Sequence, residues 1–314
     1  FEQAHARIVS AVPRTPMLRS QTLSNRVGAP VYLKCENLQK TGAFKVRGAL
    51  HRLLQLSDEQ RARGVATISA GNHAQALAWA ATAAGVRCLV VMPESASPTK
   101  IRASREYGAE VILHGDAKAA FTKVFELSEK RGMTFVHPFD DEEVVAGHGS
   151  CGLEIVDQLP GVHTIVVPVG GGGLSSAIAT SVAAAKPGVA VWGVEPEGAP
   201  SMHRSLQAGE AIHLESVSTV ADGLAPPMAG VLNHELLAAH AQGVVLVSDH
   251  QIIRALRFIV ERTKLLVEPS GAAAVAALLE GHIPVEPEQP VVAVLSGGNV
   301  DLPSLCTLLS EGMD

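Results

Sequence analysis

Apolar runs typical of buried strands alternate with helical segments along most of this chain. This alternation limits the fold more than any other feature of the sequence. Strands joined by helices at such spacing form a parallel sheet with helices on both faces. The first series has expected strands at residues 65–69, 88–92, 110–113 and 134–136. The second series has expected strands at residues 164–169, 190–195, 244–247 and 291–295.

The chain is longer than a single hydrophobic core usually organises. Of its 314 residues, 47% are hydrophobic and 18% are charged, so enough apolar material is present for sizeable cores. We expect an α/β protein of two doubly wound domains, each built on a mostly parallel sheet. The smaller domain is expected at residues 63–141, inserted between the two pieces of the larger domain, residues 1–62 and 142–314.

Charge and cysteine usage exclude several classes of partner. The formal net charge is −6 and no basic cluster carries interleaved aromatic residues, so we expect no nucleic-acid partner. The four cysteines are scattered without a CxxC pair, and the histidines lack the spacing of metal ligands. We therefore expect no disulfide framework, no metal site, and a reducing compartment, the cytoplasm.

An uncharged stretch at residues 164–185 is long enough to suggest a membrane span. Pro168, four consecutive glycines and the pair Ser175-Ser176 interrupt this stretch and divide it into a strand, a loop and a helix. Because a spanning helix would have to be continuous, we expect no membrane segment here.

One lysine is set between apolar residues at an expected helix start. Apolar residues at helical spacing predict a helix from Gly42 to about Leu56, with Thr41 as its cap. Lys45 would lie in the first turn, where the helix dipole disfavours an ammonium group. Burial beside Phe44 acts in the same direction, and a neutral amine is a nucleophile. Most single lysines are solvated surface charges, so the other motifs have to decide its role.

A run of glycines follows the expected strand at residues 164–169 and precedes a helix; it consists of Gly170, Gly171, Gly172 and Gly173. Successive glycines let backbone amides converge on one anion at a helix N-terminus. This predicts a phosphate-binding loop, with an ordinary flexible turn as the alternative. A match to G-x-G-x-x-G at residues 147–152 follows acidic residues and no buried strand. We interpret it as a helix-entry turn and keep a nicotinamide enzyme only as a last alternative.

Two further polar loops follow buried strands. The first loop contains Ser69, Ala70, Gly71, Asn72 and His73, and this density of hydrogen-bond donors suits a small carboxylate. A turn with a capping serine is the alternative. The second loop, residues 296–299, begins with Ser296 and again places a hydroxyl at the end of a strand.

Taken together, these motifs resemble those of the fold-type II pyridoxal-phosphate enzymes, in the branch of serine/threonine dehydratases and serine racemases. The likeness covers nearly the whole chain and its motifs come in the same order, at residues 36–49, 69–75, 168–173 and 296–299. The resemblance implies a tryptophan synthase β-like fold with pyridoxal 5′-phosphate as cofactor. It also implies a small amino-acid substrate and a homodimer.

The resemblance implies a role for each matched residue. Lys45 stands where the family forms its Schiff base, and Phe44 stands beside the cofactor ring. Asn72 matches the residue at the phenolic oxygen, and Ser296 matches the residue bonded to the pyridine nitrogen. The cofactor phosphate is matched by Gly170, Gly171, Gly172, Gly173 and Leu174. The substrate carboxylate is matched by the loop of Ser69, Ala70, Gly71, Asn72 and His73.

The family's chemistry here is the removal of water from L-threonine or L-serine, giving a 2-oxo acid and ammonia. A neutral serine at the ring nitrogen weakens the cofactor's electron sink, which favours loss of a β-substituent. Lys45 would take the α-proton as general base. Racemases of this branch carry a second serine where this chain has Ala70, which cannot transfer a proton. We therefore favour dehydration over serine racemase, a dehydratase for hydroxyaspartate or phenylserine, and a cofactor-binding protein without turnover.

Three more positions bear on this resemblance. Glu195 matches a residue near a divalent cation in some relatives, but Ser201 stands where those relatives have an acid, so we expect no metal. Phe139 stands where some relatives have an asparagine near the cofactor, and no cofactor contact is expected there. Glu268 matches an active-site carboxylate, with a helix-entry residue as an equal alternative.

Overall fold

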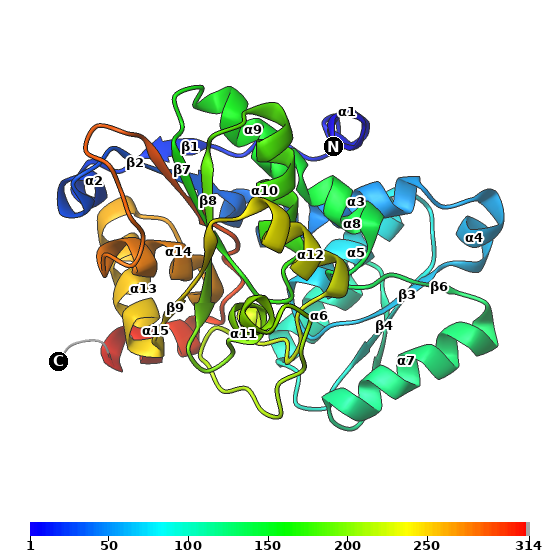
Figure 1. The fold of residues 1–314 in the computed structure, drawn as a ribbon. Helices are drawn as coiled ribbons and strands as arrows, with labels where there is room; N and C mark the ends of the chain where they lie inside the picture. The colour runs from blue at the N-terminus through cyan, green and yellow to red at the C-terminus, as the bar shows by residue number, and fades with distance from the viewer. Residues whose placement is uncertain (312–314) are drawn as a thin grey trace.

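The computed structural model describes residues 1–311 and contains two sheets (Figure 1). The larger sheet has the order β1-β2-β10-β7-β8-β9, and only the β1–β2 pair is antiparallel. Its strands are Met17–Arg19, Val31–Cys35, Val291–Leu295, Thr164–Pro168, Ala190–Pro196 and Gly243–Val247. The smaller sheet has the order β5-β4-β3-β6 and is wholly parallel. Its strands are Glu110–Leu113, Cys88–Met92, Val65–Ile68 and Thr134–Phe135.

Helices cover both faces of each sheet, so the predicted α/β doubly wound class is confirmed (Figure 1). One face of the larger sheet packs on α2 (Gln21–Val27), α13 (Asp249–Thr263), α14 (Pro269–Leu279) and α15 (Leu302–Glu311). The other face packs on α9 (Ser150–Gln158), α10 (Gly173–Ala185), α11 (Ser201–Ala208) and α12 (Val231–His240). Each helix buries one apolar stripe against strands that are almost entirely apolar, as parallel strands require.

The smaller sheet is covered by α7 (Ala117–Arg131) on one face. On its other face lie α5 (Asn72–Ala83) and α6 (Pro98–Glu106), with α3 (Val46–Leu54) packed against α5. Thus α3, which the expected division assigns to the larger domain, shares a core with the smaller sheet. The boundaries at residues 62 and 142 therefore stay a prediction.

Helix α3 corrects the expectation for the lysine segment. It begins at Val46 and not at Gly42, and Lys45 occupies the N-cap and not the first turn. The reason is a tertiary contact, since Ala43 pairs with Gly297 in an isolated bridge and the Phe44 amide donates to the carbonyl of Ser296. Two short 3-10 turns, Glu36–Leu38 and Lys40–Gly42, precede this extended link, and Thr41 is not a cap.

The remaining short helices are α1 (Glu2–Ile8), α4 (Asp58–Arg63) and α8 (Glu142–His148). The uncharged stretch at residues 164–185 folds as β7, the glycine loop and α10. Across residues 1–311, the helices all fall short of the length and hydropathy that a membrane span requires.

Candidate active site

A cavity of about 410 Å³ opens where the carboxyl ends of strands from both sheets meet. Open α/β sheets bind ligands at such ends. Residues that follow β3, β4, β7 and β10 line this cavity, so segments far apart in sequence converge on one space. The structure brings together here every predicted site residue: Phe44, Lys45, Ser69, Ala70, Gly71, Asn72, His73, Gly170, Gly171, Gly172, Gly173, Leu174 and Ser296.

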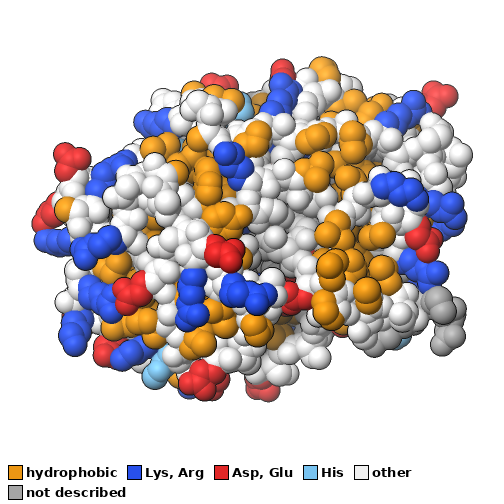
Figure 2. Space-filling model, turned by 180° about the vertical axis from the view of Figure 1, so that it is seen from behind, with side chains coloured by type: hydrophobic (Ala, Val, Ile, Leu, Met, Phe, Trp, Pro, Cys, Tyr) orange, Lys and Arg blue, Asp and Glu red, His pale blue; other side chains and the backbone are white. Residues whose placement is uncertain are grey.

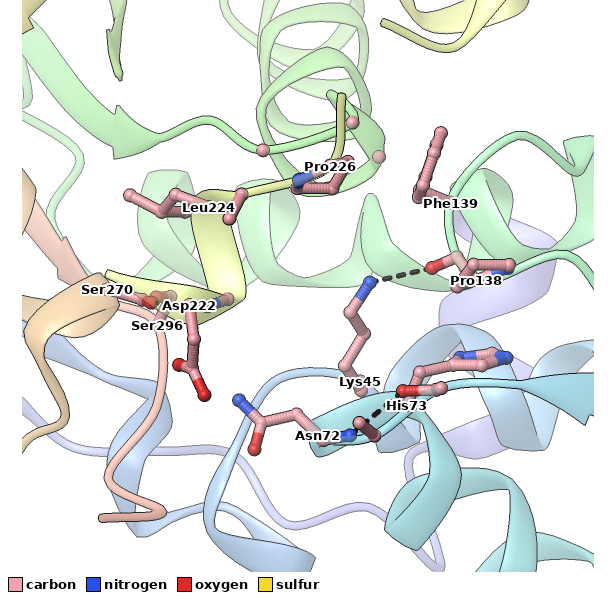
Figure 3. Close-up of a pocket in the computed structure, with 18 of the residues that line it drawn as sticks. Lys45, Asn72, His73, Pro138, Phe139, Asp222, Leu224, Pro226, Ser270 and Ser296 are labelled. Carbon is pink, nitrogen blue, oxygen red and sulfur yellow. Dashed lines mark hydrogen bonds between the residues drawn. The ribbon is translucent and has the colours of Figure 1, made fainter. Parts of the chain in front are cut away.

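The amine of Lys45 projects into this cavity and has one hydrogen-bond partner (Figure 3). Its Nζ donates to the carbonyl of Pro138 at 2.6 Å and lies 5.0 Å from the centroid of the Phe44 ring. Burial lowers the pKa of this amine from 10.5 to about 8. No carboxylate is paired with it in the described residues, so a substantial neutral fraction is available near neutral pH.

The glycine loop presents free backbone amides at the N-terminus of α10. Within the described chain, the amides of residues 170–174 donate to no backbone or side-chain acceptor. Gly172 adopts a φ of +96°, which favours glycine. A Cβ at Gly171 would lie 2.4 Å from the ring of Phe139, so the loop can approach that ring only without side chains. Unpartnered amides at a helix N-terminus form an anion site.

The loop after β3 is shaped for a second anion. The hydroxyl of Ser69 accepts a hydrogen bond from the Gly71 amide at 3.1 Å, closing the turn before α5 (Figure 3). No side chain caps α5, so the amides of its first turn, from Asn72, are open to a ligand. His73 is buried, and burial followed by the charge of Lys45 lowers its pKa well below 6.5.

Asn72 extends from the start of α5 along the cavity wall toward Asp222 (Figure 3). Its Nδ2 donates to Oε1 of Glu268 at 2.6 Å, and its Oδ1 accepts from Nδ2 of Asn299 at 2.8 Å. Burial, with a contribution from the Asp222 carboxylate, raises the pKa of Glu268 to about 7. Glu268 therefore lines the cavity as a buried carboxyl group bonded to a predicted cofactor ligand.

Several lining residues were not predicted from the sequence. The carbonyl of Pro138 belongs to the backbone, so no residue-type pattern could reveal it. Residues 222–226 fall in a stretch without periodicity, and only their glycine and proline mark them as a loop. Lys100 of α6 also lines the cavity and forms an ion pair with Asp222. Phe139 lines it too, while its expected lack of cofactor contact stays a prediction.

Glu195 lies away from the cavity residues and is buried at the end of β8. Its carboxylate accepts from Ser201 Oγ at 3.3 Å, the Met202 amide at 2.8 Å and the His203 amide at 2.7 Å. Burial raises its pKa to about 8. In the part of the chain that the structure describes, no group of three or more His, Cys, Asp or Glu side chains could hold a metal ion.

The donor set of the cavity fits a phosphorylated aldehyde with a heteroaromatic ring. Lys45 supplies the amine, residues 170–174 supply amides for a phosphate, and Ser296 supplies a neutral hydroxyl. The side chain of Phe44 provides an apolar ring at the same wall, and its edge packs on His148 with ring centroids 4.8 Å apart. These residues fit pyridoxal 5′-phosphate.

Comparisons with known proteins lead to the same family. Residues 8–297 match the family model described as pyridoxal-phosphate dependent enzyme. The chain is 44% identical to the L-threonine ammonia-lyase of Geobacter sulfurreducens, over 100% of this chain and 78% of that relative. It is also similar to the solved structure of a threonine deaminase from the source abbreviated T.th., with a TM-score of 0.90 and 41% identity over 96% of this chain and 97% of that one. For serine racemase from Dictyostelium discoideum the TM-score is 0.90 and the identity 38%, again over 96% and 97%. The chain thus belongs to the family of pyridoxal-phosphate dependent enzymes and uses pyridoxal phosphate as its cofactor.

Proposed function

We propose that this protein is a lyase that removes water from L-threonine and L-serine and releases a 2-oxo acid and ammonia. The observation that carries the proposal is the amine of Lys45, with its lowered pKa, in one cavity with unpartnered glycine amides. The choice of reaction is supported by relatives named L-threonine ammonia-lyase and threonine deaminase, which this chain matches over 96% of its length or more.

The residues of the cavity divide the work of this reaction. Bound pyridoxal phosphate supplies an aldehyde for imine formation and a ring that withdraws electrons from the substrate's α-carbon. The amides of residues 170–174 hold its phosphate, while Phe44, Asn72 and Ser296 face its ring. The amides of the loop from Ser69 to His73 bind the substrate carboxylate.

Lys45 has the proton-transfer role in this proposal. Its neutral amine takes the α-proton of the substrate, and the β-hydroxyl leaves with a proton as water. The unsaturated amino acid that results then adds water and loses ammonia, giving the 2-oxo acid. The water lost in the first stage is regained in the second, so the overall products are one 2-oxo acid and one ammonia.

The test of this function is Lys45→Ala beside Lys130→Ala, a matched change of an exposed lysine at the end of α7. Release of 2-oxo acid from L-threonine should fall by about 10²–10⁴-fold in the first variant, the usual contribution of a general base, and stay unchanged in the second. Borohydride should fix the cofactor to residue 45 in the unmodified protein. Attachment to another side chain would overturn the assignment.

A second function is favoured by the likeness to serine racemase structures. Racemisation needs a second group that transfers a proton, and Ala70 in the cavity wall has only a methyl group. We infer that pyruvate forms from L-serine faster than D-serine does, and that Ala70→Ser raises the D-serine rate. Faster D-serine formation by the unmodified protein would reverse the order of the two functions.

We also propose that the protein works as a homodimer in the cytoplasm and that residues 63–141 form a separate smaller domain. Large hydrophobic side chains such as Leu38, Leu266 and Leu302 are exposed, and Figure 2 shows hydrophobic side chains gathered in patches on one face. Such patches are typical of contacts between proteins. The four free thiols suit a reducing compartment. Light scattering on the purified protein would test the dimer directly.

A further inference from the structure

Glu268 is tied to the predicted cofactor ligand Asn72 through a chain of hydrogen bonds that has a fixed direction. Asn299 Nδ2 donates to the Thr41 carbonyl at 2.6 Å and to Asn72 Oδ1 at 2.8 Å. Asn72 Nδ2 in turn donates to Glu268 Oε1 at 2.6 Å. The chain ends on a carbonyl at one side and on a carboxylate at the other, and both ends accept hydrogen bonds.

The direction of this chain settles which way the Asn72 amide faces. A carboxamide turned by 180° would place its Oδ1 against the oxygen of Glu268, which is repulsive when that carboxyl is ionised. In the observed orientation one N–H is bonded to Glu268 and Oδ1 is bonded to Asn299, so one N–H stays free. That N–H is available for an oxygen acceptor in the cavity.

The carboxylate itself has little freedom to move. Glu268 is 3% exposed, and its amide donates to the carbonyl of Gly297 at 3.1 Å. A Cβ on Gly297 would lie 2.4 Å from Glu268 Oε1 and 3.2 Å from Asn72 Nδ2. The two bonded groups therefore fill the space beside Gly297, and any side chain there would separate them.

We propose that Glu268 is a positioning residue that orients the Asn72 carboxamide so that its free N–H faces the ring oxygen of pyridoxal phosphate. This inference rests on the proposed function, in which Asn72 contacts that oxygen. Glu268 acts on the cofactor through Asn72 and takes no proton from the substrate. Its removal should lower cofactor affinity only as long as Asn72 is present.

A double-mutant cycle tests this dependence. Each full-length holoenzyme is dialysed against graded pyridoxal phosphate, and the bound fraction is read from its visible absorbance. Glu268→Ala should raise the cofactor Kd about tenfold, the effect of one lost charged hydrogen bond. Glu268→Gln keeps an oxygen acceptor at the same reach and should stay within about threefold of the unmodified protein. In an Asn72→Ala background, Glu268→Ala should change the Kd less than about twofold.

Two results would overturn the proposal: an equal effect of Glu268→Ala with and without Asn72, or a Glu268→Gln variant as weak as Glu268→Ala. Should Glu268→Ala fail to fold, Glu268→Asp replaces it, because its shorter side chain keeps the charge but withdraws the acceptor from Asn72. The proposed function is scored separately. If Asn72→Ala leaves the Kd unchanged while Lys45→Ala abolishes turnover, Glu268 has no positioning role and the lyase function stands.

Discussion

Lys45 and Arg47 are two residues apart, yet their surroundings affect their charges in opposite ways. Lys45 has a carbonyl as its hydrogen-bond partner, and burial lowers its pKa to about 8. Burial acts against the charge of Arg47 as well, but Glu36 and Glu154 outweigh it and raise the pKa of Arg47 well above 12.5. The same segment thus supplies a neutralisable amine and a permanent cation.

The lowered pKa of Lys45 should make the cofactor-free protein less stable at neutral pH than at pH 10. A lysine amine protonates at 10.5 in the unfolded chain and at about 8 when folded, so the unfolded state binds more protons between these values and stability rises with pH there. Lys45→Met removes this dependence. Urea unfolding should show the variant more stable at pH 7 by about 1–2 kcal/mol, a figure discounted for partial exposure, and the gap should close near pH 10. A gap that does not change with pH would contradict the shift.

Arg47 should be needed for stability because it neutralises two buried carboxylates. Its guanidinium donates to Glu36 at 2.7 Å and to Glu154 at 2.7 Å, and Lys34 donates to Glu154 at 2.6 Å. Arg47→Met would leave Glu36 buried without a cation and should cost about 3–5 kcal/mol of unfolding free energy. Arg131→Met breaks a pair exposed by 38% and 53% and should cost less than about 1 kcal/mol. Similar losses in urea unfolding would refute the distinction.

Among the elements, local signals predicted most strands and failed where tertiary contacts decide. The apolar runs predicted β4 and β5 to the residue, because these strands lie inside a parallel sheet. Helix α11 was missed because its first amides are held by Glu195, a distant carboxylate on β8, and no cap stands beside it in sequence. Helix α8 is different, since Asp141 caps it locally and could have indicated its start.

The same division applies to the candidate site. Lys45, the glycine loop and Ser296 could be predicted because each combines a distinctive residue type with the end of a strand or the start of a helix. The Pro138 carbonyl and the bond between Asn72 and Glu268 could not, because they join segments 93 and 196 residues apart. Side-chain chemistry is visible in a sequence, whereas such pairings exist only after folding.

The packing of Phe139 on the glycine loop predicts how sensitive that loop is to side chains. A Cβ at Gly171 would lie 2.4 Å from the Phe139 ring, so Gly171→Ala must displace either the ring or the loop. We expect the Kd of pyridoxal phosphate to rise at least about tenfold, because misplaced amides lose hydrogen bonds to its phosphate. Gly161→Ala is the matched control, since the nearest atom to its Cβ would be 3.9 Å away. An unchanged Kd for Gly171→Ala would show that the loop tolerates the methyl group.

For the whole molecule, the cavity depends on how the two sheets and their helices are held together. Helix α6 of the smaller sheet reaches across to the rest of the chain through two polar contacts. Ser97 Oγ donates to Asp301 at 2.9 Å, and Lys100 forms an ion pair with Asp222. The ion pair stands beside the cavity, since Lys100 and Asp222 line it. It therefore joins the structural units at the place where substrate must enter.

Lys100→Met should loosen this junction without touching the groups that hold the cofactor. The side chain of Lys100 is 17% exposed and that of Asp222 is 60% exposed, so the pair is partly screened and its loss should be modest. We expect the KM for L-threonine to rise several-fold, about the effect of 1 kcal/mol, with the Kd of pyridoxal phosphate unchanged. Hydrogen exchange in α6 should quicken as well, because the helix loses an anchor. Lys118→Met, at an exposed lysine of α7, should alter neither quantity. Equal KM values for the Lys100 and Lys118 variants would mean that the pair spans the cavity mouth without influencing substrate binding.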